Sequence, residues 1–115
     1  MEFKTYKSAL IDLKERNINP DYEITFSFII HSPTEAIANC IANELTAKKK
    51  FGIVTKIDKV KGKSFFKKAE WKILVVSKEV EFKEVSEEFY YEIVGWVYAV
   101  SIHYTSTIVV FGVNA

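Results

Sequence analysis

Residues 22 to 35 read Tyr-Glu-Ile-Thr-Phe-Ser-Phe-Ile-Ile-His-Ser-Pro-Thr-Glu, and this stretch predicts both a strand and the start of a helix. In Tyr22–His31 apolar residues recur at every second position, which is the period of a half-buried β-strand. Ser32 then suits a helix cap, Pro33 suits the first helical position, and Glu35 completes a capping box. The chain is therefore expected to pass from a strand directly into a helix.

On either side of this stretch, the spacing of apolar residues predicts an N-terminal helix followed by elements in the order β-α-β-β-α-β. Gly95 lies inside the last predicted helix and indicates either a close approach to the sheet or an earlier helix end. Two helices on one face of a four-stranded antiparallel sheet, in strand order 4-1-3-2, make an α+β ferredoxin-like sandwich. The predicted elements are a helix over Phe3–Arg16, the strand Tyr22–His31, a helix with the stripe Ile37, Ile41 and Leu45 that Gly52 terminates, strands Ile53–Val60 and Ala69–Phe82 around a hairpin loop Lys61–Lys68, a helix over Lys83–Val100 with the stripe Val85, Phe89, Ile93 and Val97, and a strand Ile102–Val110.

Length and composition indicate one folded domain over residues 1–115, with a helix and turn in 1–20 and the sandwich in 21–112. Hydrophobic residues make up 49% and charged residues 27% of the chain, which excludes a disordered protein. We expect a cytoplasmic protein with no membrane partner, because no apolar run is long enough to span a bilayer and the N-terminus lacks a secretion signal. The single cysteine, Cys40, excludes an internal disulfide and is expected to be a buried structural thiol.

Several short stretches, in this order, resemble the family called regulator of ribonuclease E activity B. These stretches are Asn19-Pro20-Asp21, Ile30-His31-Ser32, Thr34-Glu35-Ala36-Ile37-Ala38-Asn39 and Lys50-Phe51-Gly52-Ile53-Val54. The resemblance implies a ferredoxin-like fold and a protein that binds a ribonuclease, or its complex, and inhibits RNA cleavage. The family's Tyr-Asp-Gly-Trp-like sequence at the last strand is replaced here by His103-Tyr104-Thr105-Ser106-Thr107.

A basic segment is the main electrostatic feature of the sequence. Residues 48–72 hold ten lysines against Asp58 and Glu70, although the whole chain has a net charge of only +1. Lysines interleaved with aromatic rings can contact phosphates while bases stack on the rings, so one interpretation is a nucleic-acid site. The other is a solvated hairpin whose phenylalanines pack on the core. The residues concerned are Lys56, Lys59, Lys61, Lys63, Phe65, Phe66, Lys67 and Lys68.

Two histidines form a second candidate. In a 4-1-3-2 sheet His31 would end the first strand and His103 would begin the last, so both would lie at the same end of the sheet. They could form a two-histidine metal or proton site, or simply be polar residues at strand boundaries. No third ligand neighbours either residue, so we expect no cofactor.

A third candidate is the aromatic group Tyr90, Tyr91, Trp96 and Tyr98 in the last predicted helix. The stripe from Val85 to Val97 already supplies a core side, so these rings are interpreted either as interface anchors or as flanks of the core.

No Gly-rich phosphate loop, nucleophile motif or zinc motif occurs, which favours a protein without enzymatic activity. The leading hypothesis is a protein-binding regulatory domain that occludes a partner. The alternatives are a nucleic-acid-binding module that uses residues 48–72, and a small-ligand or enzyme domain of the dimeric ferredoxin-like kind. Self-association is also compatible with the sequence, because the open face of the sheet would carry Ile29 and, by alternation, Leu74 and Val76.

Overall fold

The computed structural model describes residues 5–60 and 70–115, and within these ranges the chain forms three helices and a five-stranded antiparallel sheet. The α+β class predicted from the sequence is thereby confirmed. The predicted hairpin loop Lys61–Lys68 lies outside the described residues. The elements are α1 (Tyr6–Glu15), β1 (Glu23–Ser32), α2 (Glu35–Ala47), the 3-10 turn η1 (Lys49–Phe51), β2 (Val54–Val60), β3 (Glu70–Val76), β4 (Val80–Glu81), the 3-10 turn η2 (Phe82–Glu84), α3 (Glu87–His103) and β5 (Thr107–Asn114).

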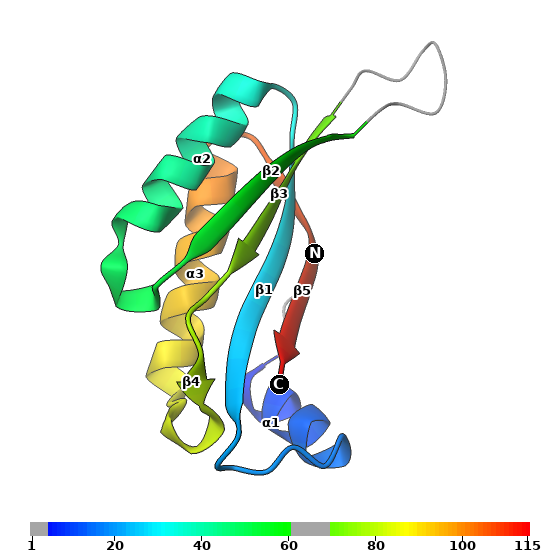
Figure 1. Ribbon diagram of the computed structural model, residues 1–115, viewed down its shortest axis with the longest axis vertical. Helices are drawn as coiled ribbons and strands as arrows, with labels where there is room; N and C mark the ends of the chain where they lie inside the picture. The colour runs from blue at the N-terminus through cyan, green and yellow to red at the C-terminus, as the bar shows by residue number, and fades with distance from the viewer. Residues whose placement is uncertain (1–4, 61–69) are drawn as a thin grey trace.

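The strand β1 is the centre of the sheet (Figure 1). It pairs with β3 on one side and with β5 on the other, and β2 pairs with the outer side of β3. The short β4 pairs with the beginning of β1, on the same side as β3 in Figure 1. Phe28 therefore lies opposite both Val75 and Phe111, so that three strands contribute inward side chains at one level.

The three helices cover one face of this sheet. Figure 1 shows α2 and α3 side by side along the strands, with α1 at the end of the sheet where β5 finishes. Alternate residues of β1 are buried beneath these helices, as the period of the predicted strand requires. The inward side chains of β1 are Ile24, Phe26, Phe28 and Ile30. No element of the described chain packs against the opposite face.

The start of α2 differs from the sequence prediction. Thr34 is the N-cap, because its hydroxyl accepts a hydrogen bond from the amide of Ile37 at 3.1 Å. Ser32 is instead the buried last residue of β1, so the predicted capping box is wrong. The helix α2 ends at Ala47, and Gly52 terminates the turn η1 in a left-handed conformation with φ of 55°.

The predicted third strand is interrupted. The chain leaves the ladder after Val76, where the Ser77 hydroxyl accepts a hydrogen bond from the amide of Phe26 at 2.8 Å. The amide of Lys78 then donates to the carbonyl of Phe51 at 3.0 Å, away from β1. Pairing resumes only over β4, so a single strand over Ala69–Phe82 was the wrong prediction.

The last helix and strand lie later in the chain than the periodicity predicts. Ser86 caps α3 by accepting from the amide of Phe89 at 3.0 Å, and the helix continues to His103. Thr105, with φ of 52°, ends it, and β5 begins at Thr107. Gly95 is an exposed residue in the middle of this helix. Both interpretations of Gly95, an early helix end and a close approach to the sheet, are wrong.

Candidate protein-binding face

The uncovered face of the sheet is the candidate functional site, and it follows from strand alternation. Because successive side chains of a strand point to opposite faces, the residues between the buried ones of β1 must point away from the helices. The same holds for the residues that pair with them on the neighbouring strands. We call this surface the open face, and its central residues are Val54, Lys56 and Asp58 of β2, Lys72, Leu74 and Val76 of β3, Ser27, Ile29 and His31 of β1, and Thr107, Val109 and Val110 of β5.

A band of aliphatic side chains crosses the open face. Val54 pairs with Val76, and Ile29 pairs with both Leu74 and Val110. Val54 is 69% exposed and Val110 is 46% exposed, so the two ends of the band stand in solvent. Placement of Ile29, Leu74 and Val76 on this face agrees with the alternation predicted from the sequence. A contiguous exposed apolar patch on a folded protein is typical of an interaction site.

A β-bulge widens the band on β5. The register between β1 and β5 shifts at Ile29 and Ile30, which leaves Val109 as an extra residue between the paired Ile108 and Val110. Ile108 is buried, whereas Val109 and Val110 are both exposed. A bulge re-aims side chains in this way, so that two consecutive valines face solvent. Sequence alternation alone could not reveal this, because it assumes an unbroken register.

Charged groups of both signs surround the band. Asp58 lies directly opposite Lys72 across β2 and β3. His31 Nδ1 lies 3.0 Å from a carboxylate oxygen of Glu70. The open face therefore has an aliphatic centre and a polar margin without a large excess of either sign, which is the usual anatomy of a protein interface.

The structure divides the predicted basic set. Lys56 pairs with Leu74 and belongs to the open face, whereas Lys59 pairs with Trp71 on the helix side of the sheet, with its Nζ 5.9 Å from the Trp71 ring. These two lysines therefore do not form one surface. The remaining members of the set lie outside the described residues; they are Lys61, Lys63, Phe65, Phe66, Lys67 and Lys68.

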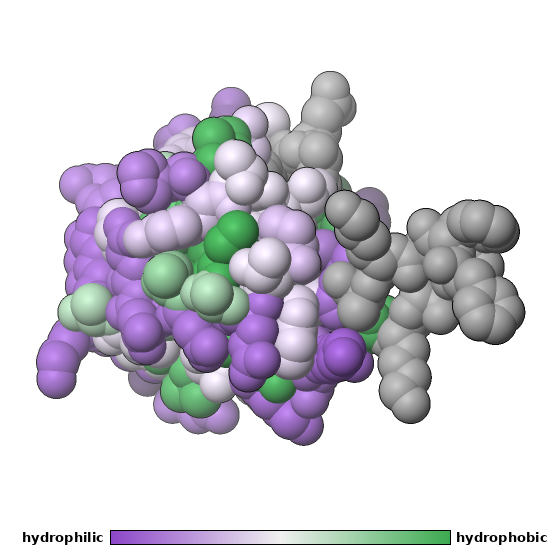
Figure 2. Space-filling view, turned by 90° about the horizontal axis from the view of Figure 1, so that it is seen from above, coloured by the Kyte–Doolittle hydropathy of each residue, from purple (hydrophilic) through white to green (hydrophobic). Residues whose placement is uncertain are grey.

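The two histidines do not occupy two strands. His103 is the last residue of α3, where its ring packs against Tyr104 at a centroid distance of 4.8 Å, so its predicted place at the start of a strand is wrong. His31 borders a hollow of about 400 Å³ that Pro33, Glu70 and Thr107 also line. Figure 2 looks onto this end of the molecule, where apolar residues are interspersed with hydrophilic ones. Among residues 5–60 and 70–115, no group of three or more His, Cys, Asp or Glu is placed to hold a metal ion.

The four predicted interface aromatics have different environments. Tyr90 is only 1% exposed and packs among the rings of Tyr6 and Phe26, so its interpretation as an interface anchor is wrong. Burial raises the pKa of Tyr90 to about 12. Trp96 is half-buried beneath Lys48, whose Nζ lies 4.6 Å from the ring centroid. Tyr91 and Tyr98 are exposed, as an interface requires.

Cys40 is exposed on α2, and the prediction of a buried thiol is wrong. The stripe Ile37, Ile41 and Leu45 points to one side of the helix, but Cys40 precedes Ile41 and therefore lies about a quarter turn further round, on the solvent side. The helices of the described chain include none that is long and apolar enough to cross a membrane.

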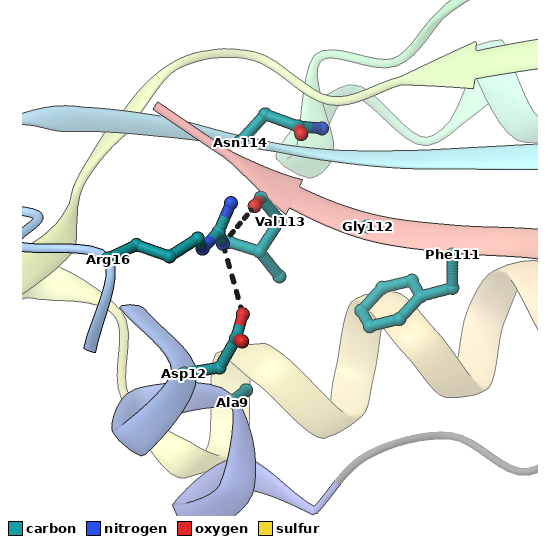
Figure 3. Close-up of a pocket in the computed structure, with 7 residues that line it drawn as sticks. All are labelled: Ala9, Asp12, Arg16, Phe111, Gly112, Val113 and Asn114. Carbon is teal, nitrogen blue, oxygen red and sulfur yellow. Dashed lines mark hydrogen bonds and ion pairs between the residues drawn. The ribbon is translucent and has the colours of Figure 1, made fainter. Parts of the chain in front are cut away.

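A second hollow, of about 260 Å³, lies between α1 and β5 (Figure 3). Arg16 donates to the carbonyl of Val113 at 2.7 Å and lies 3.2 Å from the carboxylate of Asp12. Its guanidinium thus covers an acceptor on the outer edge of β5, and Asp12 balances its charge. This arrangement protects an edge strand and does not offer an uncompensated cation to a ligand.

Two of the residues on which the family resemblance rests, Asn19 and Gly52, have structural roles in this fold. Asn19 accepts a hydrogen bond from the amide of Asp21 at 2.9 Å and forms the turn into β1, while Gly52 ends η1. Folds of this size host many functions, so function has to be argued from the surfaces. No protein-family model, no curated protein and no solved structure matches the chain.

Proposed function

We propose that this chain is a non-enzymatic, protein-binding regulatory domain with a ferredoxin-like fold that binds its partner on the open face. The observation that carries the proposal is the exposed aliphatic band from Val54 to Val110, on a face that no described element covers. Leaving such a band in water is unfavourable by roughly 25 cal/mol per Å² of apolar surface, and a bound protein would remove that cost. The ferredoxin-like assignment is supported by the strand order β2-β3-β1-β5 with all three helices on one face.

A protein suits this face better than a nucleic acid does. Binding to a phosphate backbone needs a surplus of cations, and single-stranded nucleic acid also uses aromatic platforms. The described part of the open face instead has Lys72 opposite Asp58, and its apolar centre is aliphatic. We therefore keep the nucleic-acid module, which rests on the charge of residues 48–72, as the alternative.

Regulation by occlusion is part of the same proposal. A rigid sheet with a polar margin can cover a partner's surface without any chemistry of its own. The resemblance to the ribonuclease E regulator makes a cytoplasmic ribonuclease, or a protein of its complex, the partner class to test first.

The test is binding of purified candidate ribonuclease to the wild-type chain and to three lysine variants, by calorimetry. Val54→Lys and Val110→Lys place a charge at either end of the band, and we expect each to weaken binding at least about tenfold, or about 1.4 kcal/mol. Ile11→Lys changes a residue of similar exposure, 56%, on α1 and serves as the matched control.

Equal weakening by all three lysine variants would contradict the open face as the binding surface. The proposal of a ribonuclease partner would fail if the wild-type chain bound none of the candidates at about 100 µM. Salt-sensitive binding of single-stranded RNA that persists in Val110→Lys would favour the nucleic-acid alternative instead.

A further inference from the structure

The helix α3 exposes a second surface, on the opposite side of the molecule from the open face. Tyr91 and Tyr98 are each 46% exposed and Ile102 is 54% exposed, and Gly95 lies among them. Their spacing of four, three and four residues places them along one line of the helix. We call these four residues the α3 seam.

The other sides of α3 pack within the molecule, and the seam itself has a contact to α1, because the hydroxyl of Tyr91 accepts a hydrogen bond from the amide of Tyr6 at 3.1 Å. Residues Ile93, Val97 and Val100 are buried against the sheet. On the side facing α2, Glu92 forms an ion pair with Lys50 and Trp96 lies beneath Lys48. The exposed line of large apolar residues is therefore additional to a complete core face. In an amphipathic helix that needed only to cover a sheet, this side would be polar.

The spacing of the α3 seam is that of a coiled-coil contact, in which apolar residues alternate at intervals of three and four. Gly95 leaves a gap in this line, because no atom of the described residues lies within 4 Å of the position of an added Cβ. At the next position of the α3 seam, three residues later, Tyr98 supplies a large ring. The surface thus contains both a hole and a knob of matching kind.

We propose that the α3 seam is a self-association surface on which a second copy of this chain packs antiparallel about a two-fold axis. A two-fold interface uses the same patch on both copies, so the patch must complement itself. Antiparallel packing places Tyr98 over Gly95 of the partner subunit and Tyr91 against Ile102 of the partner subunit, and the axis repeats both contacts. A parallel pair would instead place ring on ring and hole on hole.

Charge on the flank of the α3 seam also selects the antiparallel arrangement. Glu88 lies in the first turn of α3 and His103 is its last residue, and both lie toward the side that faces α2. In an antiparallel pair Glu88 comes beside His103 of the partner subunit, once on each half of the interface. A parallel pair would bring the carboxylates of Glu87 and Glu88 together with the same groups of the second copy, which is unfavourable.

The expected dimer is weak. With 17 residues α3 is about 25 Å long, and one helix pair buries less than the roughly 800 Å² per partner of a standard interface. We expect a dissociation constant of about 0.1–1 mM. Because the α3 seam is on the helix layer, the dimer would leave both open faces directed outward, so that two partner molecules could bind. The inference is independent of the proposed function and could hold if that function failed.

Sedimentation equilibrium from about 10 µM to about 1 mM tests the proposal. We expect Ile102→Lys to raise the dissociation constant at least about tenfold, while Ile11→Lys, at a similarly exposed isoleucine, changes it by less than about twofold. Gly95→Gln should fill the hole and weaken the dimer to a similar degree. In the monomer the same change should raise the melting temperature, because glutamine forms helices better than glycine.

A chain that stays monomeric at about 1 mM would overturn the proposal, as would equal weakening by Ile11→Lys. The orientation has a separate test in a Cys40→Ser background. Tyr91→Cys and Ile102→Cys chains, when mixed with a short bis-maleimide, should cross-link to each other faster than either links to itself. Faster self-linking of the Tyr91→Cys chain would show a parallel pair and overturn the antiparallel arrangement.

Discussion

Gly95→Ala is the sharpest test of how α3 is built. Gly95 is the ninth of 17 residues in the helix, is exposed, and does not have a positive φ. An added methyl group would meet no atom of the described residues within 4 Å. The substitution therefore changes only the helix propensity and the entropy of the unfolded chain.

The expected gain in the free energy of unfolding is about 0.5–1 kcal/mol, the difference between glycine and alanine inside an exposed helix. A domain of 115 residues has an unfolding entropy of about 0.24 kcal/mol per kelvin near its melting temperature. The melting temperature should therefore rise by about 2–4 °C. Urea unfolding followed by circular dichroism should show a higher midpoint with an unchanged slope.

Gly52→Ala is the matched control, because it makes the same chemical change in the opposite environment. Gly52 has φ of 55°, and an added Cβ would lie 2.7 Å from the Cβ of Lys78. Lys78 is held in place by its amide hydrogen bond to the carbonyl of Phe51, so it cannot easily move away. This variant should lose about 2 kcal/mol or more of stability.

Both variants should be measured at about 10 µM, well below the concentration at which the α3 seam would associate. A neutral or destabilising Gly95→Ala would refute the reasoning, because it would mean that the helix is broken at this residue or that another surface covers it. A Gly52→Ala variant as stable as wild type would refute the left-handed turn that ends η1.

Two further predictions concern buried polar groups. Between about pH 10 and pH 12 folded Tyr90 keeps its phenolic proton while the unfolded chain loses it, so wild-type stability should fall with pH by about 1–2 kcal/mol relative to Tyr90→Phe. Urea unfolding over this range checks the difference, and an equal pH dependence in wild type and Tyr90→Phe would contradict it. Ser77→Ala should cost about 1–3 kcal/mol in the same assay at pH 7, because it leaves the buried amide of Phe26 without its acceptor; a loss below about 0.5 kcal/mol would show that another group replaces the hydroxyl.

Much of the fold could be predicted because its signals are local. The alternation in β1 places Phe26 and Phe28 inside whatever the rest of the chain does, and the structure buries both. The helical spacing of Ile41 and Leu45 likewise identified the buried side of α2. From such elements the α+β class and the face carrying Ile29 follow.

The errors occur where two local patterns compete. Ile102, Tyr104, Ser106 and Ile108 alternate like a strand, yet the first of them belongs to α3 and only the last belongs to β5. Hydrogen bonds from Tyr104 and Ser106 back to the carbonyls of Val100 and Ser101 close the helix end. Alternation over a few residues cannot distinguish a helix end from a strand start, because both satisfy it.

For the candidate sites, the exposure of some single residues could be predicted from the sequence, but contacts between distant segments could not. Tyr91 and Tyr98 could be predicted to be exposed because they lie opposite the core stripe of α3, but Tyr90 could not be placed without its contacts to α1. The pairing of Val54 with Val76 and the bulge at Val109 depend on register between strands that are distant in sequence.

The sequence by itself determined the α+β class, the order of the main helices and strands and which side of β1 is buried, because hydrophobic periodicity acts over a few neighbouring residues. Only the tertiary structure decided that the aliphatic band is continuous, that Gly95 and Ile102 join Tyr91 and Tyr98 in one exposed line, and that His103 ends a helix instead of beginning a strand. Those properties depend on which segments pack together, and residue spacing along one chain does not encode that packing directly.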